Sequence, residues 1–351
     1  RTVQHAVDEA DSWDEILVSG QVYTAIRLRD NFTQAVYISK SVTIRGGYGA
    51  DFPIRDADVH PVTLDAQGRG RVVRARRDVS FTLENLRLTA GAATVGSTLD
   101  QIGGGIYAKG AHPVISGCQI FSNTAGNAAG GVYVGSSQRA VLLHNEVFNN
   151  RATSSGGGIF LSHVGPDTAV ISNRVYNNVC GAFGGGIMLD GVSYVWLEAN
   201  RVFSNSAGNK GGGITLMRSG DVALLGNEIA SNAASNGGGG IYLSSSPIAT
   251  LTNKEHSFSL RELSATGAFR PTGQDGLFPF GVAIGQDTVF AVVEEAAGKG
   301  AVQAVVDIVP LYAVPDRLAD NRREQSDGIG ADKAARFADD PDAGIDIIVE
   351  G

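Results

Sequence analysis

The stretch Gly103-Gly104-Gly105-Ile106 decides the fold, because close relatives of it recur along the chain. Ala129-Gly130-Gly131-Val132 is one such tetrad, and four more follow it. The apolar residues that close the tetrads are separated by 26, 27, 28, 27 and 27 residues and are Ile106, Val132, Ile159, Ile187, Ile214 and Ile241. Repeats at a fixed period of this size form stacked units, each of which buries its apolar face against its neighbours. The period therefore predicts a solenoid.

Two polar markers keep the same register as the tetrads. The first lies nine residues before each closing apolar residue from Val132 onward and comprises Asn123, Asn150, Asn178, Asn205 and Asn232. The second lies five residues earlier still and comprises Cys118, Asn145, Asn173, Asn200 and Asn227. At an inward-facing bend, each amide can donate to and accept from the Asn one coil away, which offsets the cost of burying it. The spacing predicts buried Asn ladders.

The content of each repeat identifies the kind of solenoid. One unit holds three short β-like runs, at 158–161, 169–172 and 174–177, separated by Gly, Asn and Ser, which favour bends. No segment between the markers has a helical period of ten or more residues without glycine. The pattern predicts an all-β fold, a right-handed parallel β-helix with three strands per coil of about 27 residues.

The repeat also resembles a known class of proteins. Asn-x-Val-Phe-x-Asn-x-Ala at 200–207, followed by Gly-Gly-Gly-Ile, is similar to the right-handed β-helix repeat proteins of bacterial surfaces, including the polymorphic outer-membrane proteins. The FxxN spacing of that family is shortened here to Phe203-Ser204-Asn205. The segments 2–10, 15–18 and 41–48 resemble the N-terminal cap of secreted β-helix proteins. The resemblance covers residues 1–253 and implies a secreted or cell-surface protein but no particular reaction, since β-helices include lyases, hydrolases, epimerases and adhesins.

Composition divides the chain into two parts. The chain has 351 residues, 47 of them Gly, and a net charge of −8. Residues 254–351 hold 17 Asp and Glu against 9 Lys and Arg, whereas the first 253 residues hold 19 of each, so the imbalance lies entirely in the C-terminal part. We expect a β-helix over 1–253, with a helical cap in 1–14, and a small acidic α+β domain or cap over 254–351.

The two cysteines are expected to be free thiols. Cys118 and Cys180 lie about two coils apart in register, roughly 10 Å, which exceeds the reach of a disulfide. The sequence contains no apolar run of about 18 residues, so no membrane-spanning helix is expected.

An aromatic column follows the closing apolar residues. Alternation along a strand points these side chains outward. The column comprises Tyr107, Tyr133, Phe160, Met188, Thr215 and Tyr242, and its aromatic members Tyr107, Tyr133, Phe160 and Tyr242 are the predicted ligand-binding residues. An exposed aromatic strip is suited to stacking against sugar rings. The alternative is side-chain stacking that only stabilises the sheet, or cover by a loop or partner chain.

The turn after the same strand supplies the catalytic candidates His163, Asp190 and Arg218. They come from successive coils and therefore converge, and a lyase needs a base together with a cation that neutralises a carboxylate. The alternative is an ordinary polar turn.

Two other groups of charged residues each have a structural and a ligand-binding interpretation. The first is a basic cluster that comprises Arg69, Arg71, Arg74, Arg76 and Arg77. We interpret it primarily as a surface that forms salt bridges with Asp56, Asp58 and Asp65, and secondarily as an anion-binding site. Asp340, Asp342 and Asp346 form either a solvated turn or a Ca²⁺ loop, although they lack EF-hand spacing.

The sequence thus favours a secreted or cell-surface β-helix with a structural, adhesive or assembly role and no catalytic activity. The alternative is a carbohydrate-binding protein or a polysaccharide-active enzyme, such as a lyase, hydrolase or epimerase. Expected partners are a polysaccharide, other surface proteins or further copies of the chain. Nucleic acid is not expected, because no aromatic-basic module is present. No cofactor is expected apart from the Ca²⁺ alternative.

Overall fold

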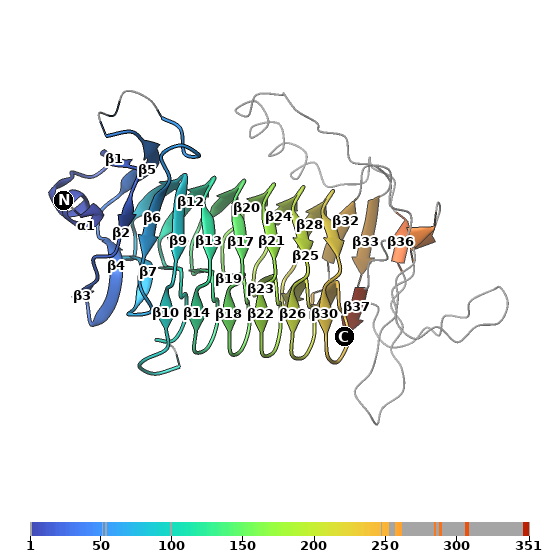
Figure 1. The fold of residues 1–351 in the computed structure, drawn as a ribbon. Coiled ribbons are helices and arrows are strands. Elements are labelled where there is room, and N and C mark those ends of the chain that lie inside the picture. The colour runs from blue at the N-terminus through green and yellow to red at the C-terminus, as the bar shows by residue number, and fades with distance from the viewer. Residues whose placement is uncertain are drawn as a thin grey trace.

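The computed structural model describes residues 2–50, 52, 55–98 and 100–246, together with strands at 248–252, 257–261, 284–285, 288–289, 306–308 and 347–350. Its strands stack into an elongated solenoid that runs from the N-terminal helix α1 (Val3–Glu9) to strand β32 (Ile248–Thr252), as Figure 1 shows. Successive coils pair in parallel along each side, so the predicted parallel β-helix is confirmed.

Three long sheets form the sides of the solenoid. Sheet A contains β1 (Glu15–Ser19), β5 (Val42–Tyr48), β8 (Ser80–Glu84), β12 (His112–Ser116), β16 (Val141–Leu143), β20 (Thr168–Ile171), β24 (Val195–Glu198), β28 (Val222–Leu225), β32, β33 (Ser257–Arg261) and β36 (Val306–Ile308). Sheet B contains β2 (Val22–Tyr23), β6 (Val62–Asp65), β9 (Leu86–Thr89), β13 (Gln119–Phe121), β17 (Glu146–Phe148), β21 (Arg174–Tyr176), β25 (Arg201–Phe203) and β29 (Glu228–Ala230). Sheet C contains β3 (Arg27–Arg29), β4 (Phe32–Ile38), β7 (Arg71–Ala75), β11 (Ile106–Lys109), β15 (Val132–Gly135), β19 (Ile159–Ser162), β23 (Ile187–Asp190), β27 (Ile214–Met217), β31 (Ile241–Ser244) and β37 (Ile347–Glu350).

Each regular coil carries a fourth strand that the sequence did not reveal. Sheet D consists of two-residue strands, namely β10 (Ala92–Ala93), β14 (Thr124–Ala125), β18 (Arg151–Ala152), β22 (Val179–Cys180), β26 (Ser206–Ala207) and β30 (Ala233–Ala234). Their inward residues are small, and two-residue strands leave no alternating apolar pattern to recognise.

The closing apolar residues of the tetrads face the interior of the solenoid. Ile106, Val132, Ile159, Ile187 and Ile214 are fully buried, and each lies beside the equivalent residue of the next coil. Burying such a side chain stabilises the fold by roughly 1.5–3 kcal/mol. The column explains why a single coil is not stable alone, since each residue is covered by its neighbours above and below.

The Asn markers form two buried ladders, as predicted. In the first, Asn178 Nδ2 donates to Asn205 Oδ1 at 3.0 Å and to the carbonyl oxygen of Val147 at 2.9 Å. Asn178 Oδ1 accepts from both the backbone N–H and the Nδ2 of Asn150. The second ladder repeats the pattern from Asn145 onward. Each amide is satisfied on all sides, which removes the cost of burying it.

Glycine is required in the tetrads for two reasons. The first position has a left-handed backbone, with φ of +68° at Gly156. At the third position, a Cβ on Gly158 would lie 2.7 Å from the carbonyl oxygen of Gly186 and 2.9 Å from Asn178 Nδ2. The stacked backbones therefore leave no space for a side chain beside the ladder.

The N-terminal helix covers the first coil. Its residues Val3, Gln4 and Val7 are buried, and the Thr2 side chain accepts a hydrogen bond from the N–H of His5 as the N-cap. Gln4 acts like an added strand, because its Oε1 accepts from the N–H of Tyr37 and its Nε2 donates to the Tyr37 carbonyl. The predicted helical cap is therefore confirmed.

Both cysteines are buried free thiols, also as predicted. Burial raises the pKa of Cys118 to about 12 and that of Cys180 to about 11. Cys118 occupies the first position of the second Asn ladder, where its N–H donates to Asn145 Oδ1.

Several strands of the C-terminal part extend the solenoid sheets. β33 pairs antiparallel with β32, β36 pairs with β33, and β37 pairs parallel with β31. A separate pair joins β34 (Ile284–Gly285) and β35 (Thr288–Val289). The predicted domain boundary after residue 253 stays a prediction. No helix within the described residues is long and apolar enough to cross a membrane.

Candidate anion-binding site

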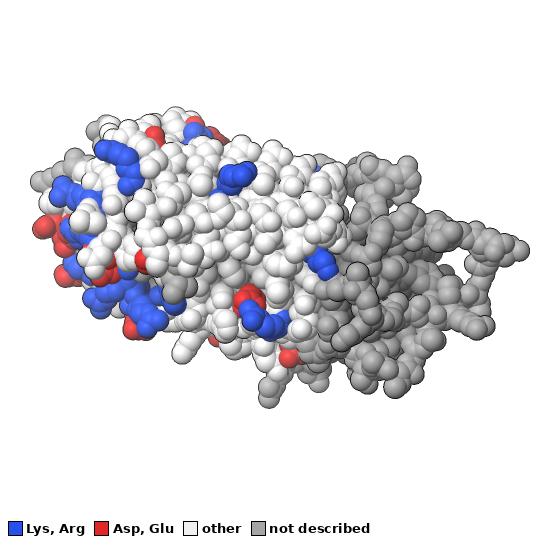
Figure 2. Space-filling view, turned by 90° about the horizontal axis from the view of Figure 1, so that it is seen from below, with Lys and Arg blue, Asp and Glu red and all other residues white. Residues whose placement is uncertain are grey.

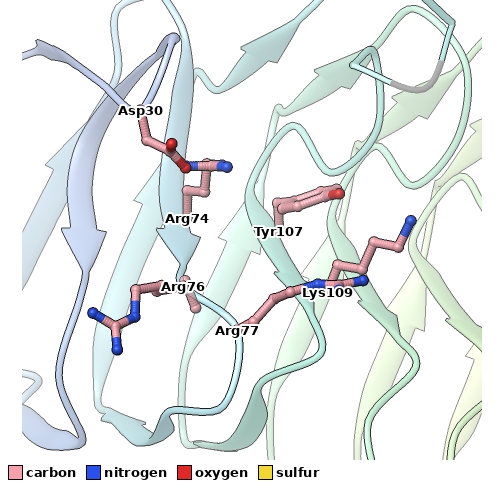
Figure 3. Close-up of a pocket in the computed structure, with 7 residues that line it drawn as sticks. Asp30, Arg74, Arg76, Arg77, Tyr107 and Lys109 are labelled. Atoms are coloured by element: carbon pink, nitrogen blue, oxygen red, sulfur yellow. The ribbon is translucent and has the colours of Figure 1, made fainter.

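A pocket of about 250 Å³ opens on sheet C near the N-terminal end of the solenoid (Figure 3). The β7 strand and the turn after it contribute Arg74, Arg76 and Arg77, and the neighbouring coil contributes Tyr107 and Lys109 from β11. Asp30, in the turn between β3 and β4, also lines the pocket, as does Ala75. Four cationic side chains thus share the pocket with a single carboxylate.

Asp30 is engaged by Arg74. Their charged groups, Arg74 Nη1 and Asp30 Oδ2, lie 2.6 Å apart, and the Arg74 side chain is 13% exposed. The contact is an ion pair without the alignment of a hydrogen bond, because Arg74 Nη1 has no acceptor in favourable geometry. The guanidinium also lies over the rings of Phe32 and Tyr37, at 4.4 and 5.3 Å from the ring centres. Arg74 is therefore held in place from three sides.

The other three cations have no carboxylate partner in the described part of the chain. Arg76, Arg77 and Lys109 form none of the ion pairs found there. Arg77 packs over Gly110, where an added Cβ would lie 3.1 Å from its Cγ, and extends toward Lys109 in Figure 3. Arg76 extends in the opposite direction. The lining residues thus carry a net excess of positive charge, with four cations against one carboxylate.

Tyr107 offers a neutral hydroxyl beside these charges. Burial raises the pKa of its phenol, and the charges of Arg71, Arg74 and Arg77 oppose this effect only in part. One face of its ring stacks on Tyr133 at 5.4 Å, and the guanidinium of Arg71 lies 5.1 Å from the ring centre. At neutral pH the Tyr107 O–H is therefore available as a donor or acceptor.

Arg71 packs against the Tyr107 ring next to the pocket. It is buried, and its guanidinium donates to the backbone carbonyls of Ile102 and Asp100. Burial lowers the pKa of Arg71 to about 10, so the side chain stays charged at neutral pH. Its charge is held between the rings of Phe32 and Tyr107.

The expected salt bridges between the Arg cluster and Asp56, Asp58 and Asp65 are wrong. Asp56 and Asp65 instead accept from backbone N–H groups of their own turns, and Arg69 donates to Gln67 Oε1 and the Thr24 carbonyl. The early coils have long, irregular turns, so nearness in sequence did not predict contact. In the view of Figure 2, charged side chains gather at the N-terminal end, and the middle coils of that face are nearly uncharged.

The predicted aromatic column forms in the expected register, but it is not an exposed strip. Tyr107, Tyr133 and Phe160 pair in sequence along sheet C. Tyr133 is only 8% exposed and Tyr242 only 3%. Tyr133 stacks on Tyr107 and meets Phe160 edge to face, and Tyr242 stacks on Phe183. The column is therefore not an open stacking platform, and its burial fits the alternative of side-chain stacking and cover. Tyr107 is the member that lines the pocket, and ligand binding by the column stays a prediction.

The catalytic candidates are brought together in part. Arg218 Nε and Nη2 donate to both carboxylate oxygens of Asp190 at 2.6–2.9 Å. His163 lies in the adjacent turn, where its Nδ1 contacts Ser162 Oγ at 2.9 Å and its ring covers Gly191. Arg218 thus holds the Asp190 carboxylate in an ion pair, and a catalytic role for these three residues stays a prediction. The pair joins two coils.

Two further predictions concern metals. No group of three or more His, Cys, Asp or Glu within the described residues could hold a metal ion. Asp340, Asp342 and Asp346 lie outside the described residues.

The match to a family model agrees with this architecture. The model of the right handed beta helix region family matches residues 73–255, more than half of the chain, so the chain belongs to that family. No curated protein matches it. Among solved structures, the chain is similar to the periplasmic alginate epimerase AlgG, with 17% identity and a TM-score of 0.34 over 66% of this chain and 57% of that chain. It thus spans less than two thirds of the epimerase's length.

Proposed function

We propose that the chain is a secreted or cell-surface β-helix that binds an acidic polysaccharide against sheet C and does not cleave it. The proposal rests mainly on Arg77 and Lys109, two cations that lie together at one pocket without a carboxylate partner in the described chain. Similarity of the Asn-x-Val-Phe repeat to bacterial surface proteins supports the location.

The charges favour carboxylate or sulfate groups. An arginine fork matches the geometry of such groups, and charge-assisted hydrogen bonds are about twice as strong as neutral ones. Tyr107, a neutral phenol at the same pocket, can bond to a sugar hydroxyl. The pocket therefore offers partners for both the acid group and the hydroxyls of a sugar acid.

The position of the pocket favours an extended ligand. Its cations come from two neighbouring coils, and sheet C continues beyond them for further coils along the solenoid axis. A nucleic acid is a less suitable ligand, since it requires contacts to many phosphates and these cations are confined to one end of the sheet.

The lining favours binding over catalysis. Proton abstraction requires a free base within hydrogen-bond reach of the substrate. The pocket contains one carboxylate, which faces Arg74, no histidine among its lining residues, and the Tyr107 phenol, whose raised pKa keeps it protonated at neutral pH. We therefore predict that no unsaturated products or new reducing ends form from uronate polysaccharides, with or without Ca²⁺. A product that disappears in Asp190→Ala, while that protein still folds, would overturn this part of the proposal.

Titration calorimetry with a uronate oligosaccharide, a sulfated oligosaccharide, neutral dextran and single-stranded DNA tests binding. Arg77→Gln and Lys109→Gln should each weaken uronate or sulfate binding about tenfold, the equivalent of 1.4 kcal/mol for one charged contact. Arg151→Gln, which removes an exposed cation on sheet D, is the control and should change nothing. Equal affinity for dextran, equal loss in Arg151→Gln, or tighter binding of DNA would each contradict the proposal.

A further inference from the structure

The outward face of sheet B carries an aromatic ladder that the sequence analysis missed. Phe121, Phe148, Tyr176 and Phe203 lie in register on successive coils, with ring centres 5.0–5.1 Å apart and interplanar angles of 3–6°. Each ring is half-buried, because its faces contact its neighbours and its edge points away from the sheet. Thr89 and Ala230 continue the column at its two ends. In Figure 1, sheet B faces the viewer and no other described segment crosses it.

A charged column runs beside the ladder, two residues earlier on each strand. In coil order it comprises Arg87, Gln119, Glu146, Arg174, Arg201 and Glu228. Within the chain, Glu146 pairs with Arg174 at 3.0 Å and Glu228 pairs with Arg201 at 2.6 Å. Arg87 has no ion pair in the described part of the chain.

Both columns match their own reversed copies about the same line, the aromatic ladder by symmetry and the charged column by complementary charge. The aromatic ladder consists of four rings with one small residue at each end, so its centre lies between β17 and β21. When a second copy of the charged column is reversed about that line and laid against the first, Arg87 faces Glu228, Gln119 faces Arg201, and Glu146 faces Arg174. A shift of one coil in either direction places arginine opposite arginine. Among registers shifted by at most two coils, only the central one brings opposite charges together without placing like charges opposite each other, and no other register aligns all four rings of the two ladders.

The geometry points to a homodimer in which two chains pack sheet B against sheet B, antiparallel, about a two-fold axis that runs along the strands between β17 and β21. An axis in this direction keeps each column opposite its own copy, as an isologous interface requires. An axis along the solenoid would instead place the charged column on the aromatic one. The second copy is therefore the occupant that best fits this face.

The size of the face sets the expected strength. Six strands at ~4.8 Å and three residues at ~3.3 Å give a patch on the order of 300 Å², well below the roughly 800 Å² per partner of a stable interface. We expect a weak dimer, with a Kd in the micromolar range or above. Opposed charges across the axis fix its register rather than supply most of its affinity.

The ends of the charged column give the sharpest test. Arg87 and Glu228 are five coils apart, about 24 Å, so they meet only across the proposed axis. Arg87→Glu alone and Glu228→Arg alone each place like charges opposite each other twice, and each should weaken self-association at least tenfold. An equimolar mixture of the two variants restores both opposite pairs and should associate about as tightly as the wild type.

Sedimentation equilibrium on the full chain measures all three cases, with one variant labelled for the mixture and Arg151→Glu on sheet D as the control. Thermal unfolding checks that each variant folds. Recovery in the mixture alone supports the antiparallel dimer. A wild type that stays monomeric at the highest soluble concentration, a mixture no tighter than either variant, or equal weakening by Arg151→Glu would overturn it.

Discussion

Replacing Asn178 with alanine should destabilise the fold through the buried ladder. Asn178 is fully buried, and its Oδ1 accepts from the N–H and the Nδ2 of Asn150, both at 3.0 Å. Asn178→Ala leaves these two donors without an acceptor. Each orphaned buried donor costs about 1–3 kcal/mol, so the loss should be roughly 2–6 kcal/mol. A water that enters the vacated space would bring the loss toward the lower end of this range.

Asn236→Ala is the matched control. Asn236 Nδ2 donates to Asn209 Oδ1 at 3.0 Å, with the same 27-residue offset, but the pair is exposed and water can replace the bond. Its removal should cost less than about 0.5 kcal/mol. Equilibrium urea unfolding, followed by circular dichroism, measures both free energies of unfolding. If Asn178→Ala and Asn236→Ala differed by less than about 0.5 kcal/mol, the ladder would not stabilise the fold as argued.

Three other changes test the packing and charge of the solenoid. Gly158→Ala should lower the free energy of unfolding by about 2 kcal/mol or more, because its Cβ would lie 2.7 Å from a backbone oxygen. Gly220→Ala is the control: its Cβ would have no atom within 4 Å, so the same urea assay should show no change. Burial raises the pKa of Cys118 from its usual value near 9.0 to about 12. Because the unfolded chain ionises this thiol at a lower pH than the folded chain does, part of the free energy of unfolding should be lost as pH rises from 9 toward 12. An equally steep decline in Cys118→Ala would refute this. Arg218→Ala should destabilise more than Asp190→Ala, because the Asp190 side chain is 13% exposed and would lose its partner, whereas that of Arg218 is 67% exposed; equal melting temperatures would contradict the asymmetry.

The fold could be read from the sequence because its markers are local and periodic. The closing apolar residues, the Asn ladders and the tetrad glycines each have one stacking solution, and all three agree in register over five coils. The two-residue strands of sheet D were missed because Ala152 and Cys180 give no alternating signal.

The site could be predicted only in part. Tyr107 and the Arg cluster were visible, but Asp30 and the joining of Arg74 to Tyr107 depend on register in the early coils, which lack the tetrads. The ladder through Phe148 was missed for a different reason. Its residues lie two positions before Asn150 and its equivalents, on strands of only three residues, which are too short to show an alternating pattern that would mark them as an outward column.

The most direct test of acidic-sugar binding is a crystal structure of the full chain with a uronate tetrasaccharide. We predict electron density for a carboxylate within hydrogen-bond distance of Arg77 and Lys109, with a sugar hydroxyl at Tyr107. An oligosaccharide bound on another face, or an empty pocket at a concentration that saturates binding in solution, would contradict the proposed function.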